Sequence, residues 1–245
     1  MKFLSNLALI TGGGTGIGRG LAEALARQGT RVIITSRRAS VLAEVCATNP
    51  GISAYQLDLT DRAALAKAAK ELPEKFGPID CLINNAGVQR IQVLREPQPL
   101  DFGDLEIDTN LSALLATTAA LLPHLMAQPR SSIVNITSGL AYVPLARMPV
   151  YCATKAAVHS FTQSLRHQLR GTPVRVIELA PPAVRTELHD YMGPKGREIG
   201  IPLEDFVAEA MAGLNAGEEE ISVGGAKQMR ADPAGAFLRL NEPAR

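Results

Sequence analysis

The sequence predicts an α/β fold in which a doubly wound parallel sheet carries helices on both faces. Two observations support this fold class: short apolar and β-branched runs recur seven times in 245 residues, and helix-patterned stretches separate them. Strands that alternate with helices in this rhythm form parallel sheets joined by crossover helices. The length also fits a barrel of eight strand and helix units, but seven runs are one short of that number.

The strands are expected at residues 7–11, 31–35, 52–57, 81–84, 132–137 and 174–179, with a weaker seventh at 220–223. The first helix follows the first strand. In it Ile17, Leu21 and Leu25 recur at four-residue spacing, and Gly29 is expected to end it.

Two long helices are expected in the second half of the chain. One covers residues 104–127, is bent by Pro123, and carries one apolar stripe made of Ile107, Leu111, Leu114, Leu115, Leu122 and Leu125. The other covers residues 151–169 and turns inward Val158, Phe161, Leu165 and Leu169.

We expect a single domain over residues 1–245, because no repeat, low-complexity tract or linker divides the chain. Residues 181–202 contain four prolines and three glycines, which predicts a mobile loop beside the substrate site. The last twenty or so residues contain Gly224, Gly225, Pro233 and Gly235, and are expected to be irregular.

Composition excludes several classes of function. The net charge is +1, no long basic block occurs, Trp is absent and aromatic residues make up 4%, which argues against nucleic-acid binding. No apolar run reaches 18 residues, so no membrane span is expected. The partner is therefore expected to be a small molecule.

The cysteines and the N-terminal residues indicate the compartment. Cys46, Cys81 and Cys152 are too few and too scattered for a disulfide framework or a CxxC metal site, and they fit reduced thiols in a cytoplasm. The short apolar run near residue 1 stops at a Gly-rich turn without a cleavage site, so we interpret it as the first strand rather than a signal peptide.

A Gly-rich turn joins the first strand to the first helix, with the sequence Thr11-Gly12-Gly13-Gly14-Thr15-Gly16-Ile17-Gly18. Glycines let the backbone approach a diphosphate, and a helix N-terminus offers free N–H groups to the anion. Glycine clusters are often only loops. The position between a strand and an amphipathic helix favours dinucleotide binding.

The end of the second strand bears on which dinucleotide binds. An acid there would accept hydrogen bonds from a ribose 2′-OH, but the sequence has Ser36, Arg37 and Arg38. Guanidinium groups pair with a 2′-phosphate, so NADP(H) is preferred over NAD(H). The alternative is that both arginines are solvated residues at the start of a helix.

Tyr151 and Lys155 are four residues apart and therefore share one face of a helix. A cation beside a phenol favours the phenolate and lowers its pKa from about 10, which suits a general acid or base. Alone, this pair also fits an ordinary exposed helix on which the two residues meet by chance.

Five motifs follow one another along the chain: Thr11-Gly12-x-x-x-Gly16-Ile17-Gly18, Asn84-Asn85-Ala86-Gly87, Asn110, Ser138 and Tyr151-x-x-x-Lys155. In this order and rough spacing they resemble the short-chain dehydrogenase/reductase family, over about residues 4–190. The resemblance implies a Rossmann-type sheet of seven parallel strands, nicotinamide-dependent carbonyl or alcohol chemistry, and dimers or tetramers.

The resemblance also implies roles for four residues. Tyr151 would be the proton donor in reduction or the base in oxidation, and Lys155 would hold the nicotinamide ribose and lower the pKa of the phenol. Ser138 would bind the carbonyl oxygen, and Asn110 would kink its helix and position a water. Without the family pattern, Ser138 fits a strand-end cap and Asn110 an exposed helical residue.

Further cofactor contacts are implied by the same resemblance. Asn85, Ala86 and Gly87 would face the adenosine side and Asp58 and Leu59 the adenine, although a tight turn and a helix N-cap are the alternatives. The whole expected set is Gly12, Thr15, Gly16, Ile17, Gly18, Ser36, Arg37, Arg38, Asp58, Leu59, Asn85, Ala86, Gly87, Tyr151, Lys155, Pro181, Val184 and Thr186.

The sequence departs from the family at two places. Pro182 stands where the family has glycine, which puts the carboxamide contacts of Pro181, Val184 and Thr186 in doubt. After Gly225 the usual tetramer motif is missing, so we expect a dimer through the two long helices rather than a tetramer. The tail resembles a bacterial branch named after an oxidoreductase of the D-alanylation operon.

We therefore expect an NADP(H)-dependent oxidoreductase that interconverts a ketone or aldehyde and an alcohol. The alternatives are a β-ketoacyl carrier-protein reductase-like enzyme and a non-catalytic dinucleotide sensor. No metal site is expected, because the four histidines lack ligand spacing, and Ser138 lacks a hydrolase elbow.

The substrate itself stays open. Residues 139–150 and 183–200 should form its pocket, and they mix apolar side chains with Arg147, Arg185 and His189. An apolar carbonyl compound with an anionic group near an arginine would fit, although an ordinary loop has a similar composition.

Overall fold

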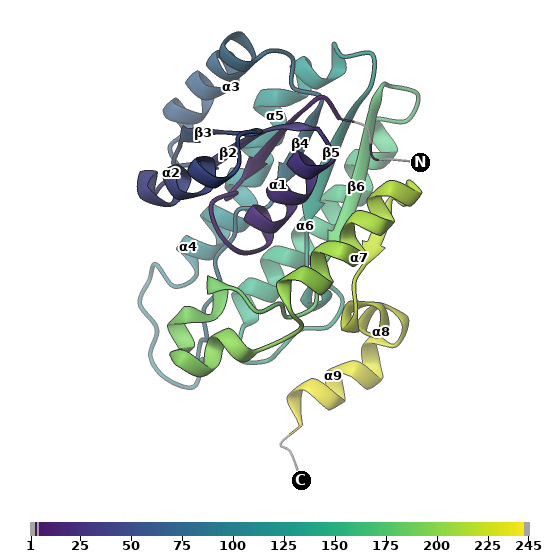
Figure 1. The fold of residues 1–245 in the computed structure, drawn as a ribbon. Coiled ribbons are helices and arrows are strands. Elements are labelled where there is room, and N and C mark those ends of the chain that lie inside the picture. Colours follow the sequence, from purple (N-terminus) through teal and green to yellow (C-terminus); the bar gives the residue numbers. More distant parts are fainter. Residues whose placement is uncertain (1–2, 4, 243–245) are drawn as a thin grey trace.

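The seven predicted strands form one parallel sheet (Figure 1). A computed structural model describes residues 3 and 5–242 of the chain, so the ends of the predicted 1–245 domain lie outside the described residues. The strand order is β3-β2-β1-β4-β5-β6-β7, which confirms the Rossmann-type fold class. The strands are β1 (Leu7–Thr11), β2 (Arg31–Ser36), β3 (Ile52–Gln56), β4 (Cys81–Asn84), β5 (Ser131–Ile136), β6 (Val174–Ala180) and β7 (Glu220–Ser222).

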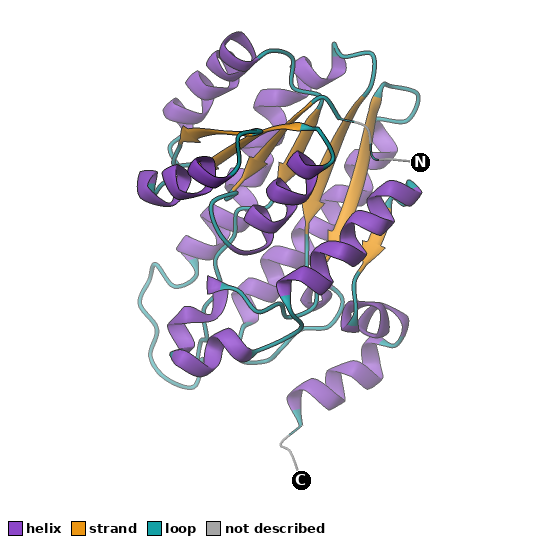
Figure 2. Ribbon diagram, viewed as in Figure 1, coloured by secondary structure: helices purple, strands orange, loops and turns teal. Residues whose placement is uncertain are grey.

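Helices cover both faces of the sheet, as Figure 2 shows. Because side chains alternate along a strand, β1 turns Ala8 and Ile10 to one hydrophobic core and Leu7 and Leu9 to the other. The first core is closed by α1 (Gly16–Arg27), α2 (Ala39–Thr48) and α7 (Leu203–Ala216). The second is closed by α3 (Arg62–Phe76), α5 (Ala113–Met126) and α6 (Pro149–Gln168).

The predicted helix at 104–127 is interrupted. The structure has a short turn α4 (Asp104–Glu106), a π-helical turn η1 (Ile107–Ser112) and then α5, which continues through Pro123. The apolar stripe predicted for this helix is therefore wrong in part. Ile107, which was expected to face the core, is 41% exposed, whereas Leu121, which was not in the predicted stripe, is buried. The extra residue of a π-helical turn shifts every following side chain around the helix axis.

The expectation of an irregular tail is also wrong. Residues after β7 form α8 (Gly225–Ala231) and α9 (Pro233–Asn241), drawn in yellow in Figure 1. Gly225 and Pro233, which suggested irregular structure, instead begin these two helices. Pro233 occupies the first turn of α9, where no backbone donor is needed, and the Asp232 carboxylate caps it by accepting from the N–H of Gly235.

The predicted loop at 181–202 contains short helical turns rather than a free chain. These are η3 (Glu187–Met192) and η4 (Pro194–Glu198), and a bridge between Val184 and Ile201 closes the segment. A further turn, η2 (Gly139–Ala141), follows β5. Among the described residues, no helix is long and apolar enough to cross a membrane.

A chain of buried amides and hydroxyls ties the central strands to the helices of one face. The Asn84 Nδ2 donates to Thr118 Oγ1 at 3.0 Å and to Asn135 Oδ1 at 2.9 Å. The Asn135 Nδ2 in turn donates to Thr162 Oγ1 at 2.9 Å, and Asn135 has no exposed surface. Since buried donors left without acceptors are costly, this chain fixes α5 and α6 against β4 and β5.

Replacing Asn135 by Ala should lower the free energy of unfolding by about 2 to 3 kcal/mol, because Asn84 and Thr162 lose their buried partner. Urea unfolding followed by circular dichroism measures this loss. Gln163→Ala on the exposed face of α6 is the matched control, and it should stay within about 0.5 kcal/mol of the unchanged protein. Equal effects of the two substitutions would contradict this assignment.

Candidate active site

A cleft of about 1080 Å³ lies across the carboxyl ends of the strands. Residues that follow β1, β2, β3, β4, β5 and β6 line it, together with parts of η3 and the tail. In this sheet the strand order reverses between β1 and β4, and open α/β sheets bind ligands at such a reversal.

The Gly-rich turn has the conformation that a close backbone approach requires. Gly12 and Gly16 have φ values of 63° and 51°, which only glycine adopts easily. Thr15, the N-cap of α1, makes no side-chain cap. Among the described residues, the N–H groups of Gly16, Ile17 and Gly18 have no acceptor. Free donors at the positive end of a helix dipole fit a diphosphate.

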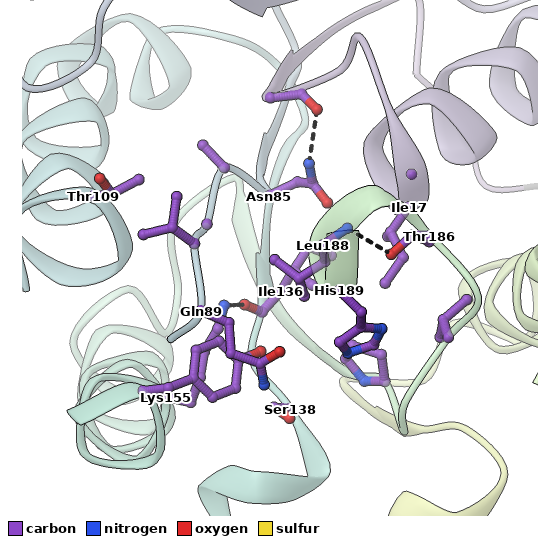
Figure 3. A pocket seen from close by; sticks show the side chains of 18 of the residues that line it. Ile17, Asn85, Gln89, Thr109, Ile136, Ser138, Lys155, Thr186, Leu188 and His189 are labelled. Carbon is purple, nitrogen blue, oxygen red and sulfur yellow. Dashed lines mark hydrogen bonds between the residues drawn. The ribbon is translucent and has the colours of Figure 1, made fainter. Parts of the chain in front are cut away.

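Asn85 holds the turn in place from β4. Its Nδ2 donates to the carbonyl oxygens of Thr11 and Gly12, at 2.9 and 3.2 Å, and Figure 3 shows its side chain at the rim of the pocket. In return the Thr11 hydroxyl accepts from the backbone N–H groups of Asn85 and Ala86. The Asn85 side chain therefore holds the turn against the end of β4, and Asn85, Ala86 and Gly87 all line the cleft.

The residues expected to select the cofactor lie together at the ends of β2 and β3. Ser36, Arg37, Arg38, Asp58 and Leu59 all line the cleft. Both arginine side chains are exposed, and among the described residues no carboxylate pairs with either.

Asp58 at this end is held by its own loop rather than free. Burial raises its pKa, but hydrogen bonds from the N–H and hydroxyl of Thr60, with the charge of Arg37, bring the pKa below its ordinary value. The Asp58 carboxylate thus already accepts from Thr60, whereas the helix N-cap in this loop is Asp61, whose carboxylate accepts from the N–H groups of Ala63 and Ala64.

Tyr151, Lys155 and Ser138 meet at the other end of the cleft. Tyr151 and Lys155 lie in the first two turns of α6, are 6% and 4% exposed, and line the cleft with Ser138. The Lys155 Nζ donates to the Ile136 carbonyl oxygen at 2.8 Å, as Figure 3 shows, and lies 5.8 Å from the centre of the Tyr151 ring. These residues are not on an exposed helix face.

Burial controls the protonation of both groups. It raises the pKa of the Tyr151 phenol well above its ordinary value, although the Ser138 hydroxyl lowers it through a hydrogen bond. Burial also lowers the pKa of Lys155 to about 8. The prediction that Lys155 lowers the pKa of the phenol is therefore wrong, because in this structure the pKa of Tyr151 is raised. Residue spacing indicated the cation but not the loss of solvent around the phenol.

Asn110 is completely buried in the π-helical turn, so the interpretation as an exposed helical residue is wrong. Its Oδ1 accepts from the N–H of Val88 at 2.8 Å, and its Nδ2 donates to the Val88 carbonyl oxygen and to Thr154 Oγ1. The side chain therefore joins the segment after β4 to α6. Both of its N–H groups are used by protein acceptors.

The segment after β6 lies over the Gly-rich turn. A Cβ atom added to Gly16 would lie 3.2 Å from Thr186 Cβ, and the Thr186 hydroxyl caps η3 by accepting from the N–H of Leu188. The Pro181 carbonyl oxygen accepts from the N–H of Gly139 at 2.8 Å. A Cβ atom added to Gly224 would lie 3.5 Å from Pro182 Cγ, so Pro182 packs near the start of the tail, and Pro181, Val184 and Thr186 line the cleft despite the missing glycine.

The tail forms a wall of the cleft that the sequence did not reveal. Met229 and Leu240 line it, and Asn241 clamps the segment before α6: its Oδ1 accepts from the N–H of Ala146 at 2.6 Å and its Nδ2 donates to the Pro144 carbonyl oxygen. A contact across 95 residues leaves no pattern in a single sequence. Gln89 was also missed, although it is 4% exposed and lines the pocket near Ser138 (Figure 3).

Of the three pocket cations expected from the sequence, only Arg147 is an exposed charge on the cleft. The Arg185 Nε donates to the Gly200 carbonyl oxygen, and Arg185 does not line the cleft. His189 lines the cleft but is 6% exposed, and burial lowers the pKa of its imidazole despite the charge of Asp190. Among the described residues, no group of acids, histidines and cysteines is placed to hold a metal ion.

This fold and this arrangement are those of a known family. The model of the short chain dehydrogenase family matches residues 6–195, and the chain belongs to that family. It is 43% identical over 227 residues to the uncharacterized oxidoreductase DltE of Bacillus subtilis (strain 168), across 91% of this chain and 89% of the relative. This similarity confirms the resemblance inferred from the tail.

Two further relatives are informative. The chain is 38% identical over 193 residues to sulfoacetaldehyde reductase 2 of Chromohalobacter salexigens, across 75% of each protein. The crystal structure of a short chain dehydrogenase from Burkholderia cenocepacia J2315 in complex with NADP superposes with a TM-score of 0.84. It is 30% identical, and the match covers 99% of this chain and all of that one.

Gly18→Ala should weaken dinucleotide binding at least about tenfold, because its Cβ would collide with Asn85 Nδ2 and the Gly12 carbonyl oxygen and displace the turn. Titration of the protein into NADPH, followed by the nicotinamide fluorescence, measures the affinity. Gly225→Ala is the matched control, since an added Cβ there has no neighbour within 4 Å. Unchanged NADPH affinity in Gly18→Ala would show that the turn does not hold the dinucleotide.

The lowered pKa of Lys155 predicts a pH-dependent stability. Between pH 8 and the ordinary lysine value of 10.5 the unfolded chain binds more protons than the folded one, so stability due to Lys155 rises with pH. The unfolding free energy of the unchanged protein should gain about 3 kcal/mol on that of Lys155→Met between pH 7.5 and 10.5. Urea titrations at several pH values measure the difference, and a constant difference would refute the lowered pKa.

Proposed function

We propose that this protein is an NADP(H)-dependent oxidoreductase that interconverts a ketone or aldehyde and an alcohol. The observation that carries the proposal is the burial of Tyr151 and Lys155 beside Ser138, in the same cleft as an uncapped helix N-terminus. One end of this cleft offers donors to a diphosphate, and the other offers a proton donor to a reacting oxygen.

The chain's own residues fit the dinucleotide. The backbone of Thr15, Gly16, Ile17 and Gly18 would hold the diphosphate, and Lys155 would hold the nicotinamide ribose. Bound NADP(H) would supply or accept the hydride at the carbonyl carbon. The exposed Arg37 and Arg38 guanidinium groups, which form no ion pair among the described residues, would take the 2′-phosphate. The relative from Burkholderia cenocepacia was crystallised with NADP, which supports this choice.

Tyr151 would donate a proton to the carbonyl oxygen during reduction. Because burial raises the pKa of the phenol, Tyr151 is protonated at neutral pH and ready to donate. Ser138 would donate a second hydrogen bond to the same oxygen and stabilise its developing charge. The positive charge of Lys155, close to the ring, would stabilise the phenolate that remains. Asn110 would position this group through Val88 and Thr154.

The proposal also includes the expected dimer and the expected cytoplasmic location. The segment expected to form a dimer exposes Leu105, Ile107 and Leu115, an apolar strip that a second subunit would cover. Cys46, Cys81 and Cys152 are all free thiols, which is consistent with a cytoplasmic enzyme. Nothing in the described part of the chain favours a carrier-protein substrate.

Tyr151→Phe should lower the rate of NADPH oxidation with a carbonyl substrate by at least about a thousandfold, because the proton donor is lost. NADPH affinity should stay within about threefold, since the phenol oxygen is one of many cofactor contacts. Stopped-flow absorbance at the NADPH band and fluorescence titration measure the two quantities. A protein that binds NADPH but oxidises none with any carbonyl compound would instead be a dinucleotide sensor.

Arg37→Ala should weaken NADPH binding at least about tenfold and leave NADH binding nearly unchanged, because only NADPH carries the 2′-phosphate. Parallel fluorescence titrations with the two nucleotides measure this difference. Arg170→Ala, an exposed arginine outside the cleft, should change neither affinity. Equal losses for both nucleotides in Arg37→Ala would rule out the 2′-phosphate site.

A further inference from the structure

Four arginines line the cleft, two at each end. Arg37 and Arg38 lie at the end of β2, whereas Arg90 and Arg147 lie at the other end of the cleft, beside Tyr191. Among the described residues no carboxylate pairs with any of the four, although arginines elsewhere, such as Arg166 and Arg197, do form ion pairs. Burial raises the pKa of the Glu106 carboxyl group, and Arg90 lies close enough for its charge to oppose that rise. Arg147 therefore carries the positive charge at this end that meets no carboxylate partner among the described residues.

The two arginines at this end flank one side chain, Tyr191. The Arg90 Cζ lies 5.6 Å from the centre of the Tyr191 ring, and Arg147 is also close enough to affect the phenol electrostatically. Tyr191 in turn lies near the phenol of Tyr151. Both charges therefore lie one aromatic side chain away from the proton donor.

The segments that carry these arginines are fixed to each other. The N–H of Gln92 donates to the Arg147 carbonyl oxygen at 2.9 Å, and the N–H of Val150 donates to Gln92 Oε1 at 3.4 Å. Glu106, 1% exposed, accepts from the N–H of Arg90 and from Gln92 Nε2. Its carboxylate does not line the cleft and is occupied by these donors, so it braces the segments from behind.

A buried amide adds a directed donor at the same place. Gln89 is 4% exposed, and its Oε1 accepts from the Tyr191 hydroxyl at 3.5 Å. Among the described residues its Nε2 has no acceptor, and Gln89 and Ser138 lie at the same end of the pocket in Figure 3. The N–H₂ group of Gln89 is therefore free to donate to a molecule bound at this end of the cleft.

Acidic residues do not balance this charge. The acids that line the cleft are Asp58, Glu187 and Asp190. Asp58 lies at the cofactor end beside Arg37, and Glu187 faces Gly16 in the diphosphate turn. Asp190 is paired with Arg197 at 2.6 Å. None of the three acids that line the cleft is therefore placed to accept hydrogen bonds from Arg90, Arg147 or Gln89 near Tyr151.

We infer that the substrate is a short carbonyl compound that carries an anionic group, a carboxylate, sulfonate or phosphonate, bound by Arg147 and Arg90 with Gln89 as a further donor. This inference rests on the proposed function, because the carbonyl carbon must lie beside Tyr151 and Ser138. The anion then lies on the far side of Tyr191 from the reacting carbon. Specificity comes from the charge, since a neutral compound of the same shape leaves the two guanidinium groups without a partner.

The test compares charged and neutral aldehydes of one skeleton with NADPH: 4-oxobutanoate against its methyl ester, with 2-oxoethanesulfonate and 2-oxoethylphosphonate to identify the preferred anion. The unchanged protein should prefer 4-oxobutanoate at least about tenfold in kcat/KM. Arg147→Ala should reduce this preference to about one, mainly through KM. Arg170→Ala, the matched control outside the cleft, should keep the preference of the unchanged protein.

Binding without turnover separates this inference from the proposed function. Calorimetric titration of butanoate and of butanamide into the NADP-loaded protein should show binding of the anion alone, lost in Arg147→Ala. If no aldehyde is reduced but this anion binding is found, the anion site stands and the proposed function fails. Reduction of the ester as fast as the acid, equal losses in Arg147→Ala, or absence of anion binding would overturn the inference.

Discussion

The hydrogen bonds between Thr11 and Asn85 connect the two strands at which the sheet order reverses. The Thr11 hydroxyl accepts from two backbone N–H groups that follow β4, and the Asn85 amide donates two bonds to carbonyl oxygens at the end of β1, those of Thr11 and Gly12. Gly18, in the first turn of α1, lies directly against this junction, with no space for a side chain. The Gly-rich turn, the start of α1 and the exit from β4 thus form one rigid unit, and the cleft opens above it.

The opposite end of the cleft is fixed by comparable bonds, and burial there sets the chemistry. Asn110 joins Val88 to Thr154 in α6, and Lys155 is bonded to the last residue of β5. These contacts withdraw Tyr151 and Lys155 from solvent, which keeps the phenol protonated and makes the ammonium costly. The frame of β4, β5 and α6 therefore determines both where the Tyr151 phenol lies and that it is protonated at neutral pH.

The sequence allowed the sheet and the Gly-rich turn to be predicted from local patterns, because strand ends meet at one edge of a parallel sheet. The grouping of Ser138 with Tyr151 and Lys155 followed from the resemblance to the family, not from these patterns. Features that depend on contacts between distant parts of the chain could not be predicted from the sequence. The side chain of Asn85 braces the turn, Asn241 clamps residues 144–146, and burial reverses the expected shift of the Tyr151 pKa. The sequence singled out Asn110, Gly225 and Pro233, but not the structure that each one forms. Asn110 lies in a π-helical turn, and Gly225 and Pro233 each begin a helix.

The crystal structure of the complex with NADP would show most directly whether this junction builds a dinucleotide site that ends at Tyr151. We expect the diphosphate against the N–H groups of Gly16 to Gly18, the 2′-phosphate on Arg37 and Arg38, and the nicotinamide ribose on Tyr151 and Lys155. A dinucleotide bound elsewhere, or one whose nicotinamide lies away from Tyr151, would contradict this expectation.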